Sequence, residues 1–373
     1  MLKKKIFWIH PQLRNYRMPL FEIMDKKYNI TFYFLEWTEN DKKYKHFKRC
    51  EKGYHYFFER FLGLNLKDII SIARGVKKND IVISSSMGSP FSFIALIFSR
   101  LFRKKIIIWQ EEFHLSNETI QNIKHIIYKI IHRFINSYYM MGIEQSMFLQ
   151  SLGVKKEKIF ISNEYPAIIY WNQKEKAIDI LTSDLTLLYI GKFAEVKGIP
   201  NLLYALKILG NKYNIALNLV GYGPLLSKIM KMIQDIGLDK IQYLGKVFDD
   251  EKKAFLFKNV DALIVPSILL KTEKSLKTEG GPLVVLESLS AGTCVIGTTA
   301  LGNVEQFIKN GVTGYIARQN DINDLADKIE QCFHDLRNGK ITKNQVFNEF
   351  KKIPNHEFQA DRFDDAIKYV FSK

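Results

Sequence analysis

One glycine-rich turn in the sequence combines backbone groups that can bind an anion with two glutamates, one of which can bind sugar hydroxyls. Residues 278–292 read TEGGPLVVLESLSAG and place two adjacent glycines before Pro282, at the predicted start of a helix. Glycines let backbone N–H groups approach a ligand closely, and a helix N-terminus favours an anion. In the loop, the Glu279 carboxylate can accept hydrogen bonds from sugar hydroxyls, whereas Glu287 lies within the helix. The same residues also fit an ordinary helix start with Glu287 on its surface.

Two lysines flank a second turn, in the segment LLYIGKFAEVKG. A strand is predicted to end at Gly191, and Lys192 and Lys197 border the loop before the next helix. Ammonium groups around such a turn suit a diphosphate, because each is a point charge with three donors. A third turn, VGYG, contains Gly221 just after another strand. Loops at successive strand ends share one edge of a parallel sheet, so the three turns together indicate a site for a phosphorylated, hydroxyl-rich ligand such as a nucleotide-sugar.

Short apolar runs alternate with amphipathic stretches along the chain, which indicates parallel sheets covered by helices on both faces. The predicted strands are 5–9, 30–35, 81–84, 106–109, 138–142, 186–190, 215–220, 241–244, 262–265, 294–297 and 314–317. The predicted helices are 19–27, 66–74, 90–102, 120–135, 199–209, 225–236, 251–257, 282–291, 304–309, 323–336 and 358–370.

The length of 373 residues suggests two domains. The polar segment 163–184 precedes the first clean strand of the second half, so we expect residues 1–165 and 166–356 to form two Rossmann-like, doubly wound α/β domains facing each other across a cleft. A helix at about 357–373 follows Pro354 and can pack back on the first domain. Ligands of such sheets bind beyond the carboxyl ends of the strands.

The net charge of +16 is concentrated in residues 1–165, which hold 28 basic and 15 acidic residues. Such a surface attracts nucleic acid, acidic lipid headgroups or a phosphorylated substrate, although a Lys-rich surface without a partner is also compatible. No helix-turn-helix, zinc or aromatic RNA-binding signature is present, so we expect no nucleic-acid partner. A cluster at 42–49 combines five basic residues with Tyr44 and Phe47, which favours the inner face of the cytoplasmic membrane as a partner, or else a solvated loop.

The sequence favours a cytoplasmic protein that associates peripherally with the membrane. It has no apolar run of 18 residues, and its first residues lack the core of a signal peptide. Cys50, Cys294 and Cys332 are far apart in the sequence, so no disulfide framework is readable and a reducing compartment fits.

The motifs of the second half resemble those of a known family. GKFAEVKG, LVGYGP, YLGKV, ALIVPS, TEGGPLVVLESLSAG and GNVEQFIKNGVTGYI follow, in order, the second-domain motifs of the family-4 retaining glycosyltransferases, or glycosyl transferases group 1. The resemblance is specific over residues 187–318 and looser over 1–165. It implies the GT-B fold of two Rossmann-like domains, and it includes the family's glutamate pair, here Glu279 and Glu287.

The resemblance also implies roles for single residues. Glu279 would lie against the donor sugar, Glu287 would bind the ribose hydroxyls, and Lys197 would hold the diphosphate and offset charge on the departing nucleotide. Lys192 stands where the family usually has arginine, and a lysine cannot make the planar bidentate contact, so phosphate binding is expected to be weaker or differently oriented. The expected donor-binding set is Gly191, Lys192, Lys197, Gly221, Glu279, Gly280, Gly281, Pro282, Leu283 and Glu287.

Two parts of the first half supply further candidates. HPQLRNYRMPLFEIM replaces the family's glycine-rich loop and resembles a subgroup of polysaccharide-building members; its Arg14 and Arg17 can meet a phosphate or an acidic acceptor sugar, or belong to a solvated loop. After the strand IIIW, Glu111, Glu112 and His114 lie where the family places a polar residue facing the donor sugar. We expect Glu111 or His114 to take that role. The expected catalytic set is Glu279, Lys197, Glu111 and His114.

The implied reaction is metal-independent transfer of a hexosyl or N-acetylhexosaminyl group with retained configuration. No Asp-x-Asp triplet, which commonly holds a divalent metal against a sugar diphosphate, occurs in the chain, so we expect neither a metal site nor a separate cofactor. The expected co-substrate is a UDP- or GDP-linked sugar, and the expected acceptor is a glycan or lipid-linked molecule of capsule, O-antigen or lipopolysaccharide synthesis. A nucleotide-sugar epimerase of the same architecture and a basic nucleic-acid-binding protein are the alternatives.

Overall fold

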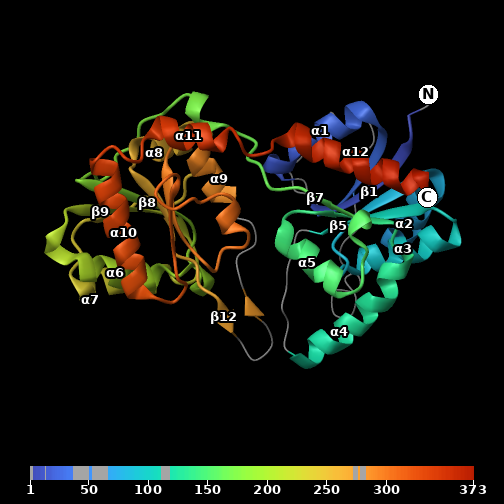
Figure 1. Ribbon diagram of the computed structural model, residues 1–373, viewed down its shortest axis with the longest axis horizontal. Coiled ribbons are helices and arrows are strands. Elements are labelled where there is room, and N and C mark those ends of the chain that lie inside the picture. The colour runs from blue at the N-terminus through green and yellow to red at the C-terminus, as the bar shows by residue number, and fades with distance from the viewer. Residues whose placement is uncertain are drawn as a thin grey trace. The chain divides into compact units, whose positions relative to one another are not determined.

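The computed structural model describes residues 3–12, 14–36, 50–52, 66–110, 118–271, 276–277 and 283–373. The chain divides into two compact units, which are described separately (Figure 1). Unit 1 contains the described residues before 114, together with Glu118–Ala167 and Pro354–Lys373. Unit 2 contains those within Ile168–Ile353. The chain thus leaves unit 1 at Ala167, two residues after the expected boundary, and re-enters it at Pro354.

Unit 1 is built on a seven-stranded sheet in the order β3-β2-β1-β4-β5-β6-β7, and every strand pairs in parallel with its neighbours. Its strands are β1 (Lys5–Gln12), β2 (Asn29–Glu36), β3 (Cys50–Lys52), β4 (Ile81–Ser85), β5 (Lys105–Gln110), β6 (Ser137–Met140) and β7 (Ile159–Ile161). Its helices are α1 (Met18–Lys27), α2 (Leu66–Lys78), α3 (Pro90–Leu101), α4 (Glu118–Ile131), α5 (Ile143–Ser151) and α12 (His356–Ser372), with the short 3₁₀ helices η1 (Asn15–Arg17), η3 (His132–Phe134) and η4 (Lys156–Lys158). This order is the doubly wound arrangement expected from the sequence.

Both faces of this sheet are buried, because successive side chains along a strand point to opposite faces. Trp8 and Ile83 lie on the face covered by α1 and α12. Phe7 and Val82 lie on the face covered by α2, α3 and α5. Near-continuous burial along the central strands explains why they are apolar runs rather than alternating patterns. Among the described residues, no helix combines the length and apolar character needed to cross a bilayer.

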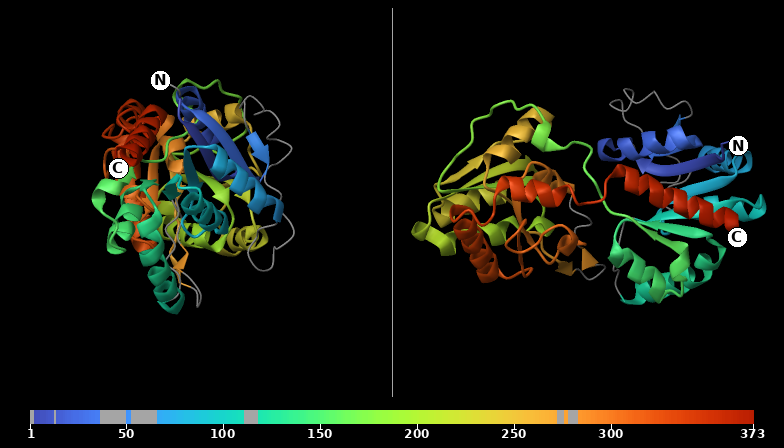
Figure 2. Two further views of the ribbon diagram at one scale, coloured as in Figure 1. Left: turned by 90° about the vertical axis from the view of Figure 1, so that its right-hand side faces the viewer. Right: turned by 45° about the horizontal axis from the view of Figure 1, so that its top comes forward.

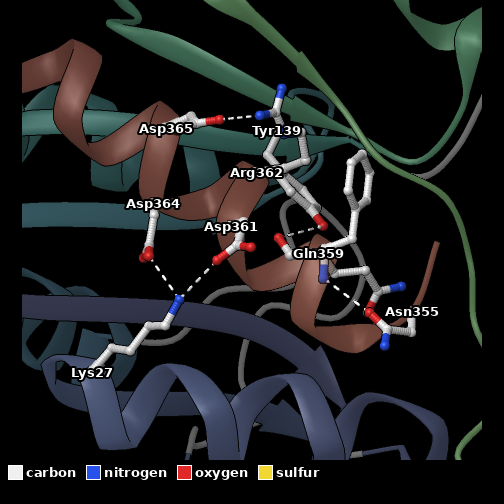
Figure 3. A network of polar contacts seen from close by, with 9 residues as sticks. Lys27, Tyr139, Asn355, Gln359, Asp361, Arg362, Asp364 and Asp365 are labelled. Atoms are coloured by element: carbon white, nitrogen blue, oxygen red, sulfur yellow. Dashed lines mark hydrogen bonds and ion pairs between the residues drawn. The ribbon is translucent and has the colours of Figure 1, made fainter.

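The C-terminal helix α12 belongs to unit 1 and lies alongside α1, the first helix of the chain (Figure 2). The Phe363 ring stacks on Tyr139 of β6 with centroids 3.6 Å apart. At the surface, Lys27 Nζ of α1 donates to Asp361 and Asp364 at 3.0 and 2.7 Å (Figure 3). The two ends of the chain are therefore joined by a buried aromatic cluster and an exposed ionic one.

Unit 2 is built on a six-stranded parallel sheet in the order β10-β9-β8-β11-β14-β15. Its strands are β8 (Leu185–Lys192), β9 (Ile215–Tyr222), β10 (Ile241–Tyr243), β11 (Ala262–Val265), β14 (Cys294–Thr298) and β15 (Gly314–Ala317), and β12 (Leu270–Lys271) pairs separately with β13 (Leu276–Lys277). Its helices are α6 (Ile199–Leu209), α7 (Leu226–Ile236), α8 (Asp250–Asn259), α9 (Leu283–Ser290), α10 (Ile322–Arg337) and α11 (Lys343–Phe350). Figure 1 shows α8, α9 and α11 on one side of the sheet and α6, α7 and α10 on the other.

The prediction of a helix over 304–309 is wrong, because only the 3₁₀ turn η8 (Val304–Gln306) forms there. The side chain of Thr313 accepts from the Lys309 backbone N–H at 2.8 Å and donates to the Phe307 carbonyl at 3.0 Å. These bonds satisfy backbone groups that a longer helix would have used, and they turn the chain towards β15. The short strands β3, β7, β12 and β13 and the helices α5 and α11 were not predicted.

Candidate functional site

The turns that follow β8 and β9 in unit 2 lie side by side at the carboxyl edge of the sheet. Gly191 at the end of β8 pairs in register with Gly221 at the end of β9. Two residues after Gly191, the Phe193 N–H donates to the carbonyl of Tyr222 at 2.8 Å. The structure therefore brings together two of the three stretches that the sequence singled out, at the edge where parallel sheets bind ligands.

Two glycines allow these turns to pack without side chains between them. Gly221 has φ +135°, and a Cβ there would lie 1.8 Å from the Gly191 carbonyl oxygen. Gly198 has φ +63°, and a Cβ there would lie 1.9 Å from the Pro266 carbonyl oxygen, just after β11. The Ile268 N–H also donates to the Val196 carbonyl at 2.9 Å. Backbone from three strand ends is therefore packed at one edge, which only glycine permits at these φ values.

The lysines predicted to bind a diphosphate both lie at this edge. Lys192 is the exposed last residue of β8, and its carbonyl accepts a hydrogen bond from the Tyr189 hydroxyl at 2.9 Å. Lys197 is partly exposed and ends the 3₁₀ helix η6 (Glu195–Lys197). The left-handed Gly198 follows as the N-cap of α6, whose N-terminus adds positive potential to that of the two ammonium groups. This combination favours a phosphate-bearing ligand.

Glu287, the helix glutamate, is partly buried in the middle of α9. Burial raises the pKa of its carboxyl, and nearby Asp250 raises it further while Lys253 lowers it. The pKa of Tyr170 is raised by burial and by the charges of Glu287 and Asp250. Glu287 is therefore not a fully solvated surface residue: it sits in a polar cluster with the N-terminal turn of α8. Sequence analysis missed Tyr170, Asp250 and Lys253, because residues 34 or more positions away from Glu287 give no local signal.

The same edge continues to β10, where further exposed groups lie that the sequence did not single out. The Gly221 N–H donates to the Gly245 carbonyl at 2.7 Å, which holds the turns after β9 and β10 together. Lys246 Nζ lies 3.6 Å from the centroid of the half-exposed Tyr222 ring. Phe248 follows with 76 % of its surface exposed. Exposed aromatics beside a cation are able to stack on a flat ligand group.

The two arginines of unit 1 have different environments. Arg14 is exposed and precedes η1. Arg17 is only 2 % exposed, its Nη2 lies 2.7 Å from Glu164 Oε1, and its guanidinium carbon lies 4.7 Å from the Trp109 ring centroid. The interpretation of both arginines as parts of a solvated loop is therefore wrong for Arg17, which is enclosed within unit 1 and bonded to a carboxylate. Acceptor binding stays a prediction for Arg14, whereas the burial of Arg17 supports a structural role.

Several predicted site residues lie outside the described part of the chain. They are Glu111, His114, Glu279, Gly280, Gly281 and Pro282, together with the basic cluster at 42–49. The described chain stops at Gln110 before the first group and resumes at Leu283, the first residue of α9, after the second. Within the described ranges, no group of three or more His, Cys, Asp or Glu side chains is placed to hold a metal ion.

Comparison with known sequences gives a family for the second unit. The model of the family "Glycosyl transferases group 1" matches residues 172–346. The chain is 29 % identical over 186 residues to N-acetyl-alpha-D-glucosaminyl L-malate synthase of Bacillus anthracis, covering 48 % of this chain and 45 % of the relative. It is 26 % identical over 190 residues to O-antigen chain mannosyltransferase C of Escherichia coli, covering 51 % and 47 %. These matches span about half the length of each relative.

Solved structures match both units. A glycosyltransferase from Rickettsia africae superposes with a TM-score of 0.78 at 17 % identity, covering 100 % of this chain and 99 % of that one. An Anabaena protein, HepE, solved in complex with UDP and glucose, superposes with a TM-score of 0.76 at 14 % identity, covering 98 % and 99 %. At these identities the likeness shows the fold, and it is the GT-B fold expected from the sequence.

Proposed function

We propose that this chain, whose residues 172–346 match the model of the glycosyl transferases group 1 family, is a retaining glycosyltransferase that uses a nucleotide-sugar donor. The observation that carries the proposal is the convergence of glycine turns, two lysines and the α6 N-terminus at one edge of unit 2. The group transferred is a hexosyl or N-acetylhexosaminyl group. The acceptor is a glycan or a lipid-linked molecule.

The donor diphosphate is held by Lys192 and Lys197. As the bond between sugar and diphosphate breaks, negative charge grows on the leaving phosphate, and fixed positive charges and N–H dipoles at that point lower the barrier. The Lys197 ammonium and the N–H groups at the start of α6 supply such charges without a metal ion, so we infer a metal-independent reaction. Gly221 lets the turns after β8 and β9 pack backbone against backbone, which keeps both turns at this edge of the sheet.

The nucleoside and the sugar lie on either side of the diphosphate. Glu287 accepts hydrogen bonds from the ribose hydroxyls, which its partial burial beside α8 supports. Glu279 lies against the donor sugar, with the backbone of the residues that follow it, from Gly280 to Leu283. We further propose that Glu111 or His114 contacts the donor sugar. The nucleotide is a uridine or guanosine diphosphate; the Anabaena protein of the same fold, solved with UDP and glucose, supports the former.

The biological setting is the assembly of a cell-surface polysaccharide, such as capsule, O-antigen or lipopolysaccharide. The Escherichia coli relative, by its name, acts on an O-antigen chain. Lipid-linked acceptors lie at a membrane, and the excess of basic residues in 1–165 suits the cytoplasmic face of an anionic one. We therefore infer a cytoplasmic enzyme associated peripherally with that membrane, and Arg14 as an acceptor contact.

Calorimetric titration of the intact chain with UDP, GDP and their glucose conjugates tests this function. We expect one diphosphate to bind, with Lys197→Ala weakening binding at least tenfold and Lys192→Arg tightening it, because arginine adds a bidentate contact. Lys207→Ala, which removes an exposed lysine from the last turn of α6, is the matched control and should bind as the wild type does.

Two results would contradict the proposal. If the wild type and the Lys197→Ala variant bind the nucleoside diphosphate with equal affinity, the diphosphate does not bind at this edge. Conversion of a nucleotide-sugar into its isomer in the absence of any acceptor would assign an epimerase instead. A transferase releases nucleotide only as it transfers the sugar to an acceptor or, slowly, to water.

A further inference from the structure

Helix α3 of unit 1 exposes an apolar stripe to solvent. Phe93, Ile97 and Leu101 recur every four residues and are 50 %, 47 % and 67 % exposed. The opposite side of the same helix carries Phe91 and Ala95, which are buried against the sheet. Helix α3 therefore packs one apolar side against the sheet, and the side that faces solvent is apolar as well. A helix that is apolar all round is normally covered on every side, so this stripe indicates a partner.

A second stripe runs along the end of α4 into η3. Ile126, Ile130 and Phe134 are again four residues apart and are exposed by 60 %, 55 % and 42 %. Tyr128 and Ile131, on the other side of α4, pack against the buried cluster under α3. Helix α4 therefore also carries apolar residues both on the side that packs against unit 1 and on the side that faces solvent.

The two stripes meet at one end. The guanidinium carbon of Arg100, on α3, lies 5.3 Å from the ring centroid of Phe134, on η3. The C-terminal end of α3 and the 3₁₀ turn after α4 are therefore neighbours. We call the six exposed apolar residues, with the basic residues among them, the α3–α4 surface; it consists of Phe93, Ile97, Leu101, Ile126, Ile130 and Phe134 with Arg100, Arg103, Lys129 and Arg133.

The charge of this surface has one sign. Residues 81–110 contain four Lys and Arg and no Asp or Glu, and residues 119–143 contain three Lys and Arg and no Asp or Glu. A second copy of this chain would bring like charges face to face, which is unfavourable. An anionic bilayer offers both complements, since acyl chains accept the apolar side chains and lipid phosphates attract the basic ones.

We propose that the α3–α4 surface docks unit 1 onto an anionic phospholipid bilayer. Phe93, Ile97 and Leu101 enter the boundary between headgroups and acyl chains, and Arg100 and Arg133 pair with lipid phosphates while their aliphatic stems remain among apolar groups. The inference rests on the proposed function, which already includes peripheral association with an anionic membrane, and it names the surface that makes the contact; that surface includes no residue of the donor site.

Vesicle flotation of the intact chain tests this proposal, using phosphatidylcholine vesicles with and without phosphatidylglycerol. We expect flotation with the anionic vesicles only, decreasing as salt is raised. The triple variant Phe93→Ser, Ile97→Ser, Leu101→Ser should bind at least about tenfold more weakly, since three apolar side chains no longer leave water. Arg133→Gln should weaken binding about fivefold.

Matched controls come from unit 2. Tyr204→Ser with Ile208→Ser removes apolar residues of α6 that are 44 % and 55 % exposed, and Lys228→Gln removes an exposed charge of α7. Both should float as the wild type does. Thermal unfolding and nucleotide titration of every variant check the fold and the donor site, so loss of vesicle binding is separable from loss of the proposed activity.

Three outcomes would overturn the proposal. One is a wild-type chain that ignores phosphatidylglycerol vesicles. Another is a triple variant that floats as well as the wild type. The third is a wild-type dimer in analytical ultracentrifugation that the triple variant abolishes, which would assign the surface to a second copy of the chain.

Discussion

Arg17 Nη2 lies 2.7 Å from Glu164 Oε1, and this contact joins residues 147 positions apart in the sequence. Arg17 ends η1, just after the first strand, and Glu164 lies three residues before the chain leaves unit 1. The two side chains are 2 % and 14 % exposed. A charge pair so well shielded from water holds the start of unit 1 against the end of its first segment.

Glu164→Gln should destabilise unit 1 by about 3–5 kcal/mol, because it leaves a buried guanidinium without its counter-charge. Urea unfolding followed by Trp fluorescence measures the change, since Trp109 contacts Arg17. Asp184→Asn is the control: it removes one partner of the half-exposed Arg337–Asp184 pair, also 2.7 Å long, and should cost less than about 1 kcal/mol. Equal effects of the two substitutions would show that the Arg17 pair is effectively solvated.

Phe363→Ala in α12 should destabilise unit 1 by about 3–5 kcal/mol, because its ring fills space between Trp8 and Tyr139. Phe358→Ala, one and a half turns earlier on the same helix, should cost less than about 1 kcal/mol, because that ring is 37 % exposed. Chemical denaturation of both variants compares them. Similar losses would mean that α12 does not form part of the unit 1 core.

Gly198→Ala should destabilise unit 2 by more than about 2 kcal/mol and weaken nucleotide binding, because the new Cβ would overlap the Pro266 carbonyl oxygen. Gly237→Ala is matched to it: Gly237 is also left-handed, with φ +76° against +63°, but no atom lies within 4 Å of its Cβ position. It should show only the cost of the left-handed conformation, about 1 kcal/mol. Thermal unfolding with and without nucleotide distinguishes the two, and equal shifts would argue against close packing of the turns.

Glu287→Gln should raise the Tm of the free protein at neutral pH by roughly 2 °C while weakening nucleotide binding. The folded-state pKa of Glu287 lies above the ordinary value of 4.5 because of burial and Asp250, so the folded state holds this proton more tightly than the unfolded state. Stability from this group is therefore full below the ordinary pKa and is lost as pH rises through the raised one. A glutamine at this position carries no charge to desolvate, so the variant does not lose this stability as the pH rises.

The matching experiment measures Tm from acidic to neutral pH for both proteins. The difference between the variant and the wild type should be small below pH 4.5, should grow with rising pH, and should then level off. A variant that is less stable than the wild type at neutral pH would contradict the desolvation of Glu287. If the variant binds nucleotide with unchanged affinity, Glu287 does not contact the ribose.

Much of the architecture was predictable from local patterns. Apolar runs such as 262–265 and 314–317 coincide with β11 and β15, because strands buried on both faces must be apolar throughout. Glycines after strands correctly indicated the turns at Gly191 and Gly221, since close backbone approach leaves no space for a side chain. The helix predicted over 304–309 failed because a hydrogen-bonding side chain, Thr313, outweighed the helical pattern.

The tertiary structure alone decided which distant residues became neighbours. Cys294 and Cys332 are separated by 37 residues, yet both are buried, and their Sγ atoms lie 3.6 Å apart between β14 and α10. The pKa of the Cys332 thiol is raised well above 9 by this contact and by burial, which keeps it protonated. Cysteine spacing gave no sign of this pair, because strand order, not sequence distance, sets which elements adjoin.

By itself, the sequence determined the two α/β units, their strand-end turns and the family motifs, since these depend on periodicity and on residue types within short windows. Only the tertiary structure enclosed Arg17 with Glu164, placed Glu287 beside Asp250 and Tyr170, and left the α3–α4 surface apolar towards solvent. Burial of a charge or exposure of an apolar side chain depends on what packs against it from remote parts of the chain, and no local pattern records that.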